Sequence, residues 1–410
     1  MERNDPRYQA YVEILKEELI PAMGCTEPIA LAYAAAKARE VLGVLPDSVQ
    51  LQVSGSIIKN VKSVIVPNTG HLKGMEAAVA AGIIAGSAEK ELEVISEVSE
   101  EKKSAIRDYL QTVPITIEHT EQGHVFDIVV TERCGQDYAR VRIADYHTNI
   151  CRIEKNGTVL YEVPLLDETV QEDARADRSL LNMQDIWDFA ETADLRDVAD
   201  LLERQIRYNN AIAEEGLLGD YGANIGRVLL TTYGNDVSNR AKAKAAAGSD
   251  ARMNGCELPV IINSGSGNQG ITCSVPLIEY AKELHSGKEK LYRALIISNL
   301  VAIHEKTGIG TLSAYCGAVS AGAGAGAGIV YLCGDGYQAA IHTVVNALAI
   351  VSGIVCDGAK ASCAAKIASS VDAALLGYNM YKCNQEFKGG DGIAVSYTHL
   401  RAHETDQYLV

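Results

Sequence analysis

Residues 307–334 carry no charged side chain, and most of residues 317–328 are glycine or alanine. A helix without charged residues is a buried helix, and small side chains let neighbouring helices approach it closely. Gly and Ala are only weakly hydrophobic, and no Lys or Arg asymmetry frames the segment, so a membrane span is disfavoured. We therefore expect this segment to lie inside a helical domain of a soluble protein that has no membrane partner.

The chain has 410 residues, enough for two domains, and a formal net charge of −16. This charge argues against nucleic acid or an anionic membrane surface as a partner. The first eleven residues are polar, so we expect no secretory signal and a cytoplasmic protein. Ten cysteines in such a protein should be reduced, and they indicate core, metal or catalytic roles.

The pattern of apolar residues predicts an α+β N-terminal domain at residues 1–170 and an all-helical C-terminal domain at residues 180–395. An acidic stretch at residues 167–177 is the expected linker. Strands are expected at residues 49–53, 57–66, 115–119, 124–131, 139–144, 149–154 and 158–163, with Asn156-Gly157 as a hairpin turn. Helices are expected at residues 5–19, 28–41, 72–85, 90–110, 183–193, 195–216, 240–247, 272–283, 288–306, 317–332 and 336–351.

The last fifteen residues do not continue any pattern of the chain before them. Residues 396–410 resemble a translated sequencing adapter, and we interpret them as a non-native tail rather than a short terminal helix. His399 and His403 are therefore left out of any metal site, despite their i, i+4 spacing.

Three cysteines in the last third of the chain stand in unusual settings. Cys316 opens the Gly/Ala run, and Cys356 and Cys363 lie seven residues apart with Gly358 between them. Three thiolates from separate segments could hold a 4Fe–4S cluster with one open iron. Zinc is an alternative, although close Cys-x2-Cys pairs are missing. Buried, unreactive cysteines are the third interpretation.

A fourth cysteine, Cys25, lies in the sequence Met-Gly-Cys-Thr-Glu-Pro at the expected start of a helix. A helix N-terminus favours an anion, so we expect a lowered thiol pKa and a reactive thiolate. A half-buried cysteine in a turn is the alternative interpretation.

A glycine-rich loop at residues 263–270, Asn-Ser-Gly-Ser-Gly-Asn-Gln-Gly, precedes an expected helix. Its backbone N–H groups could cradle a substrate carboxylate, with Ser264, Ser266, Asn268 and Gln269 as substrate-binding side chains. A phosphate cup for pyridoxal phosphate is an alternative, as is a tight connection that needs positive φ.

Further polar residues are candidates for the same site. Lys59 and Asn68 lie near expected strand ends and could bind a carboxylate or an amine. His147 precedes an expected strand and could act as a general base with a near-neutral pKa. Each of these residues could equally have a structural role.

Residues 23–28, 54–74, 263–276, 312–328 and 353–363 resemble, in this order, segments of the iron–sulfur L-serine dehydratase superfamily. The likeness is closer to its single-chain branch, which includes L-cysteine desulfidases and related uncharacterised bacterial proteins, and it covers residues 5–395. It implies that Cys316, Cys356 and Cys363 bind a 4Fe–4S cluster. It also implies that Cys25 is a catalytic base or a resting ligand of the fourth iron. The serine dehydratases have a longer interval between the last two cysteines.

The resemblance implies a lyase that converts L-cysteine to pyruvate, ammonia and sulfide by β-elimination. L-serine dehydration at the same cluster is an alternative. A pyridoxal-phosphate lyase and a non-catalytic iron–sulfur redox or sensor module are two others. The expected partner is a small amino-acid substrate, and the sequence leaves a homodimer open.

Overall fold

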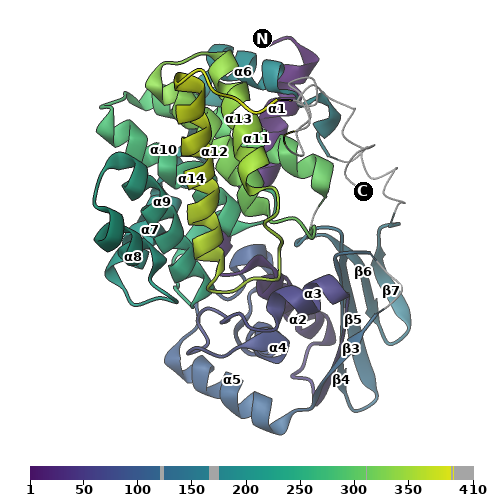
Figure 1. Cartoon of the computed structure of the whole chain (residues 1–410). Helices are drawn as coiled ribbons and strands as arrows, with labels where there is room; N and C mark the ends of the chain where they lie inside the picture. The colour runs from purple at the N-terminus through teal and green to yellow at the C-terminus, as the bar shows by residue number, and fades with distance from the viewer. Residues whose placement is uncertain (121–123, 166–174, 311, 389–390, 392–410) are drawn as a thin grey trace.

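The computed structural model describes residues 1–120, 124–165, 175–310, 312–388 and 391. A mixed sheet with helices on it forms one part, and a bundle of helices forms the other (Figure 1). The expected order of an α+β region followed by an all-helical region is confirmed. The expected tail at residues 396–410 lies outside the described residues, as does most of the expected linker.

A six-stranded sheet forms the framework of the first part, in the order β3-β2-β4-β5-β6-β7. Its strands are β2 (Ser48–Val53), β3 (Ile115–His119), β4 (Asp127–Cys134), β5 (Asp137–Ala144), β6 (Ile150–Lys155) and β7 (Thr158–Glu162). Alternate residues of β2 are buried, and β2 pairs with β3 in parallel and with β4 antiparallel. Asn156 and Gly157 both have positive φ, which confirms the expected tight turn before β7.

Helices cover this sheet on one side: α2 (Thr26–Leu42), α3 (Gly55–Val61), α4 (Gly74–Ala85) and α5 (Glu100–Thr112) (Figure 1). The strand predicted at residues 57–66 is wrong, because α3 occupies much of this segment. Its Val and Ile content favoured a strand, but the buried residues Ile57, Asn60 and Val61 follow helical spacing. The helix predicted at residues 90–110 is also divided, into a 3-10 turn η1 (Ala88–Glu93) and α5.

The second part is a bundle of helices with short 3-10 turns. Its elements are η3 (Arg178–Leu180), α6 (Met183–Thr192), η4 (Leu195–Asp197), α7 (Ala199–Leu218), α8 (Ile225–Tyr233), α9 (Val237–Met253), α10 (Gly267–Glu283), α11 (Lys288–Ile309), α12 (Gly317–Cys333), α13 (Tyr337–Val351) and α14 (Cys363–Lys382). Neither α8 nor α14 is among the helices expected from the sequence. In the part of the chain that the structure describes, no helix has the length and apolar character needed to cross a membrane.

Helix α12 is surrounded by α10, α11, α13 and α14. Its glycines make this arrangement possible. A Cβ at Gly322 would lie 2.8 Å from the carbonyl oxygen of Ser370 on α14. A Cβ at Gly328 would lie 2.8 Å from the carbonyl oxygen of Ala294 on α11. Backbones therefore touch where side chains would normally separate them, and this fixes the position of Cys316 at the start of α12.

Two short strands connect the parts: β1 (Pro21–Met23) pairs antiparallel with β8 (Pro259–Ile261). The first helix, α1 (Pro6–Glu18), packs against the bundle, where the rings of Tyr8 and Tyr11 lie 5.2 and 5.3 Å from the ring of Phe189. The N-terminus of α2 is thus held between the sheet and the helical bundle.

Gly322→Ala should destabilise the protein by about 1–3 kcal/mol, because the new methyl group overlaps backbone atoms of α14. Gly308→Ala on α11 is the matched control, since a Cβ there meets nothing within 4 Å. The control should be neutral or stabilising by up to about 1 kcal/mol. Urea denaturation of both variants measures the difference, and equal stabilities would contradict the close packing of α12.

Candidate functional site

Cys316 and Cys356 lie side by side on two short extended segments. Tyr315 and Val355 form an antiparallel bridge, and the Cys356 N–H donates to the Ala314 carbonyl at 2.7 Å. Tyr315 and Val355 are exposed. Since side chains alternate along extended backbone, Cys316 and Cys356 share the opposite face of this ribbon. The pairing brings together two thiols that are forty residues apart in the sequence.

Cys363 is the first residue of α14, and it packs with Cys25, Val64 and Met253. Cys25 is the N-cap residue of α2 and is 2% exposed. The Cys363 thiol is also close enough to Cys356 and to Cys316 for the charges to influence each other's titration. The four cysteines singled out in the sequence therefore gather in one region.

Four helices begin in this region: α2, α10, α12 and α14. In none of them does the N-cap side chain accept a hydrogen bond from the first turn. Asp5, Ser99, Asn182 and Asp236 cap α1, α5, α6 and α9 in this way, whereas six helices elsewhere in the described part of the chain are also uncapped, so the site is distinguished by four such N-termini lying together. Uncapped N-termini carry partial positive charge and free N–H donors, so this region favours anions.

Burial raises the pKa of the Cys316 and Cys363 thiols above the ordinary value. Burial also raises the pKa of Cys25, while the Arg252 charge acts in the opposite direction. The expectation of a lowered Cys25 pKa is therefore wrong for the protein alone. The cause is burial of the thiol, which disfavours the charged thiolate.

Two lysines border the cysteines. Lys306 is 9% exposed. Its burial lowers its pKa to about 8, with the neighbouring Cys356 and Cys316 thiols acting in the opposite direction. The Lys59 ammonium on α3 lies 3.5 Å from the Cys356 carbonyl oxygen. A Cβ at Gly358 would collide with the Lys59 carbonyl oxygen, so only glycine lets this loop approach α3 so closely.

The residues after Cys25 form a second polar group. The Asn60 amide donates to Glu27 Oε1 at 2.9 Å, and Cys25 Sγ lies 3.7 Å from Glu27 Oε2. The Thr26 hydroxyl donates to the Gly265 carbonyl at 2.9 Å. This last contact joins the start of α2 to the glycine-rich loop. Asn60 Oδ1 is buried and has no hydrogen-bond partner.

His147 is buried against the glycine-rich loop. A Cβ at Gly265 would lie 3.0 Å from its Cε1 atom, and the Phe126 ring packs against its imidazole at 4.7 Å. Burial lowers the pKa of His147, so the imidazole is neutral at pH 7. Its Nε2 atom has no hydrogen-bond partner in the part of the chain that the structure describes. A neutral imidazole with a free nitrogen can accept a proton.

The glycine-rich loop is held from behind by a buried amide network. Asn263 Nδ2 donates to Asn299 Oδ1 at 3.0 Å, and the side chains of Asn299 and Gln205 exchange two hydrogen bonds of 2.9 Å. Ser264 has a positive φ, and its hydroxyl donates to Asn263 Oδ1 at 2.9 Å. The network fixes the loop from which α10 begins.

The remaining residues of the loop point polar atoms into the protein. Ser266 is the N-cap of α10. Asn268 Oδ1 and Gln269 Oε1 are buried without a hydrogen-bond partner. The Gln269 side chain lies against the start of α12, since a Cβ at Gly317 would lie 2.6 Å from its Cδ atom.

Asn68 is placed differently from the other candidate residues. Its amide donates to the Ile95 carbonyl at 2.8 Å and lies 3.1 Å from Met23 Sδ. Asn68 thereby ties its own loop to the backbone at Ile95. The structure thus brings the other predicted residues together, namely Cys25, Lys59, His147, Ser264, Ser266, Asn268, Gln269, Cys316, Cys356 and Cys363.

Sequence reasoning missed Arg252 and Lys306. Arg252 is 2% exposed and ends an alanine-rich helix, α9, on the face that also buries Gly248 and Ser249. A charged residue at helical spacing on a buried face is the signal that could have identified it.

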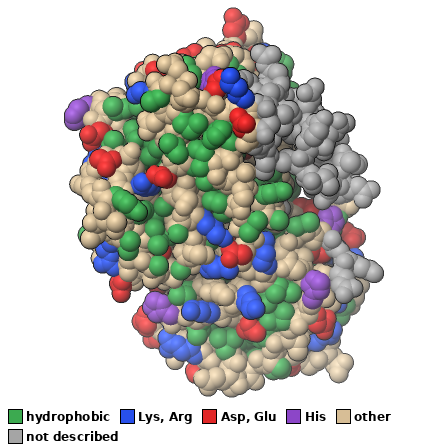
Figure 2. All heavy atoms as spheres, viewed as in Figure 1, with side chains coloured by type: hydrophobic (Ala, Val, Ile, Leu, Met, Phe, Trp, Pro, Cys, Tyr) green, Lys and Arg blue, Asp and Glu red, His purple; other side chains and the backbone are tan. Residues whose placement is uncertain are grey.

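Within the described ranges, no three His, Cys, Asp or Glu side chains are grouped closely enough to hold a single metal ion. A 4Fe–4S cluster is larger, and each of its thiolates binds a different iron, so its ligands need not share one point. Three partly buried thiols beside uncapped helix N-termini and cationic side chains fit such a group. Figure 2 shows Lys and Arg side chains gathered across the middle of the visible face, where the two parts meet.

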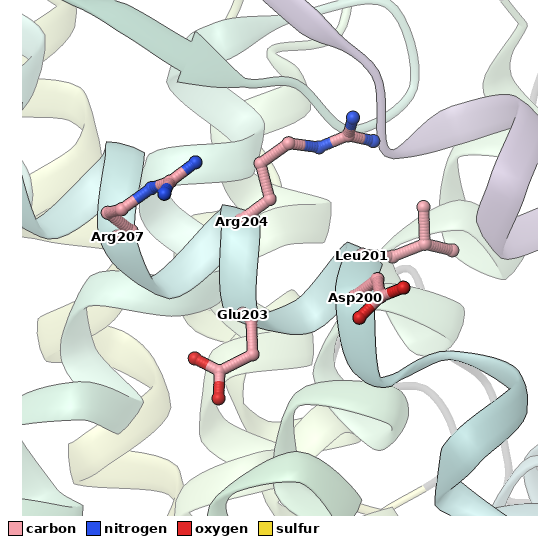
Figure 3. A pocket seen from close by; sticks show the side chains of 5 residues that line it. All are labelled: Asp200, Leu201, Glu203, Arg204 and Arg207. Carbon is pink, nitrogen blue, oxygen red and sulfur yellow. The ribbon is translucent and has the colours of Figure 1, made fainter.

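A separate cavity of about 450 Å³ lies on α7 (Figure 3), lined by Asp200, Leu201, Glu203, Arg204 and Arg207. The residues that line this cavity carry charges of both signs, and none of them is a cysteine. It is therefore distinct from the cysteine site.

Comparisons with known proteins identify the family. The model of the family described as "Serine dehydratase alpha chain" matches residues 89–397, and the chain belongs to this family. A UPF0597 protein of Desulfitobacterium hafniense is 62% identical over 393 residues, which cover 96% of this chain and 91% of that protein. UPF0597 proteins of Lachnoclostridium phytofermentans and Treponema denticola are 53% and 47% identical, covering 94% and 96% of this chain and 92% of each relative. The expected membership of the serine dehydratase superfamily is confirmed.

Asn299→Leu should destabilise the protein by about 3 kcal/mol, because it leaves the amides of Gln205 and Asn263 buried and unpaired at about 1–3 kcal/mol each. Asn210→Ala, which removes a surface amide on α7, should change stability by less than about 0.5 kcal/mol. Denaturant titration measures both. A Gln205→Leu/Asn299→Leu double variant that costs the sum of the two single variants would contradict a coupled network.

Proposed function

We propose that the protein is a lyase that removes the β-substituent of a small L-amino acid at a 4Fe–4S cluster, with L-cysteine as the substrate. The observation that carries this proposal is the gathering of Cys316 and Cys363, at two uncapped helix N-termini, with Cys356 on the adjoining extended segment, within a family named for serine dehydratase. Cys316, Cys356 and Cys363 would hold the cluster, and Cys25 would lie beside it. When bound, the cluster supplies a Lewis acid for the departing sulfur or oxygen.

His147 is the proposed general base. Its neutral imidazole and unpartnered Nε2 suit the removal of the α-proton. The electron pair of the Cα–H bond then forms the Cα–Cβ double bond as the Cβ–S bond breaks. Sulfide leaves and is protonated, and the product is aminoacrylate. Its imine tautomer reacts with water to give pyruvate and ammonia. The Cys25 thiol has a raised pKa and is a weaker candidate for the base.

L-Serine is the alternative substrate, with water as the leaving group. Thiolate sulfur is the softer ligand for iron, which favours L-cysteine. Anaerobic reconstitution with iron and sulfide, followed by assays of sulfide and pyruvate, tests the choice. Faster pyruvate release from L-serine than from L-cysteine would overturn the desulfidase assignment and keep the cluster.

A pyridoxal-phosphate lyase is the second candidate, because one observation favours it. Lys306 is buried with a pKa of about 8, and a lysine of lowered pKa suits an internal Schiff base. The uncapped N-terminus of α10 would then bind the phosphate. An activity that survives iron chelators, is abolished by hydroxylamine and requires Lys306 would support this candidate. A cluster-containing protein that turns over neither amino acid would instead support a redox or sensor module.

Cys316→Ser, Cys356→Ser and Cys363→Ser should each lose most of the reconstituted iron and nearly all activity, because two thiolates hold a cubane poorly. Cys134→Ser, Cys333→Ser and Cys383→Ser are the controls, since these thiols are at least partly exposed and lie outside the site. Iron and acid-labile sulfide analysis with the visible absorption spectrum measures the outcome. Full iron content in one of the first three variants would remove that residue from the ligand set.

His147→Gln should keep the iron content and lower the rate of L-cysteine breakdown by about 10²–10⁴-fold, as expected when a general base is removed. His285→Gln, at an exposed position after α10, is the control and should have the wild-type rate. Exchange of the substrate α-proton with deuterated water measures the same step without turnover. Wild-type exchange in His147→Gln would assign the base to another residue.

A further inference from the structure

We propose that Arg252 binds the α-carboxylate of the substrate, and that Glu27 and Asn60 bind its α-ammonium group. The inference deepens the proposed function and rests on it, because the ligand is the amino acid of that reaction. It concerns side chains outside the predicted cysteine site, and it defines the substrate class as zwitterionic α-amino acids.

Arg252 is an almost completely buried cation that forms no ion pair with any residue that the structure describes. It is 2% exposed, and its Nε atom has no hydrogen-bond partner. Asp250, two residues earlier, faces α8 instead, where its Oδ2 accepts the Ile225 N–H at 2.7 Å, and its buried Oδ1 has no partner among the described residues. A buried charge that lacks a partner is strongly unfavourable. The position is therefore explained by an anion that the protein binds.

The guanidinium group lies at the start of α10. A Cβ at Gly267 would lie 2.8 Å from Arg252 Cζ, so the guanidinium group packs directly against the first residue of this uncapped helix. Both the arginine fork and the free N–H groups of the first turn suit a carboxylate. His147 lies against Gly265 of the loop that leads into α10, and Gln269 of α10 lies against Gly317 at the start of α12. A carboxylate held at the start of α10 is therefore in the same region as the proposed base and the helix that begins at Cys316.

Acceptor atoms lie across the same site. Glu27 accepts from Asn60 and faces Cys25, and its charge influences His147, as does that of Arg252. Asn60 is 5% exposed, and its Oδ1 is buried without a donor. An ammonium group would supply the missing donor. The unmatched donor of Arg252 and the unmatched acceptor of Asn60 thus complement the two charges of one α-amino acid.

A rival role for Arg252 is to offset the charge of the cluster thiolates. Binding to the full-length protein without iron separates the two roles. L-Alanine carries both charged groups and no leaving group, L-alaninamide lacks the carboxylate, and propionate lacks the ammonium group. Isothermal titration calorimetry should show that the wild-type protein binds alaninamide and propionate at least tenfold more weakly than alanine.

In Arg252→Met the preference for alanine over alaninamide should disappear, and in Asn60→Leu the preference for alanine over propionate should fall. Arg252→Lys should keep a reduced preference, and it remains informative if Arg252→Met does not fold. Arg204→Met is the matched control, because Arg204 also has a buried Nε without a partner but lies in the cavity on α7 (Figure 3). It should bind all three compounds as the wild type does.

An unchanged preference for alanine over alaninamide in Arg252→Met or Arg252→Lys overturns the proposal, as does a wild-type protein that does not bind alanine. Loss of iron uptake in Arg252→Met with intact alanine binding also overturns it and assigns Arg252 to the thiolates. Zwitterion binding by a protein that never incorporates iron supports the Arg252 assignment and refutes the cluster lyase. The two proposals therefore fail separately.

Discussion

The contact of α12 with its neighbours through backbone rather than side chains is the constraint on which the site depends. Gly322 and Gly328 meet carbonyl oxygens of α14 and α11 where any side chain would keep the helices apart. The interior is close-packed, so a helix held on several sides cannot shift without losing contacts along its length. This packing positions Cys316 at the start of α12. The extended segment that pairs with the Cys356 segment is therefore also fixed in place.

The interior of the site is polar, unlike the close-packed apolar surroundings of α12. Several buried atoms lack partners, among them Nε of Arg252, Oδ1 of Asn60 and Nε2 of His147. The amides of Gln205, Asn263 and Asn299, by contrast, are paired with one another in a buried network. Unpaired groups are costly, and proteins tolerate them mainly where a ligand completes them. Such atoms also occur away from the cysteines, as at both carboxylate oxygens of Glu132, so the binding site is indicated by an unmatched cation and unmatched acceptors beside the cysteines rather than by their number.

Most of the fold could be predicted from apolar spacing, because long helices such as α12 and alternating strands such as β5 carry strong local signals. The errors have local causes. Residues 57–66 are rich in Val and Ile, and only packing beneath the site makes α3 a helix. The cysteines and the glycine-rich loop were identified by type and motif. Arg252 was not, because nothing local shows that the end of α9 is buried and unpaired, a property that depends on tertiary contacts.

The site also explains why the two parts of the chain are joined as they are. Glu27, Asn60 and His147 come from the sheet part, whereas Arg252 and the cluster cysteines come from the bundle. Two of the contacts between the parts lie within the site: Thr26 with Gly265, and Lys59 with Cys356. A small substrate can touch both parts only if they are docked closely, which the pairing of β1 with β8 achieves. The site is therefore complete only when the two parts are docked. If the parts were separated, the bundle would keep the cluster cysteines and Arg252 but would lose Glu27, Asn60 and His147.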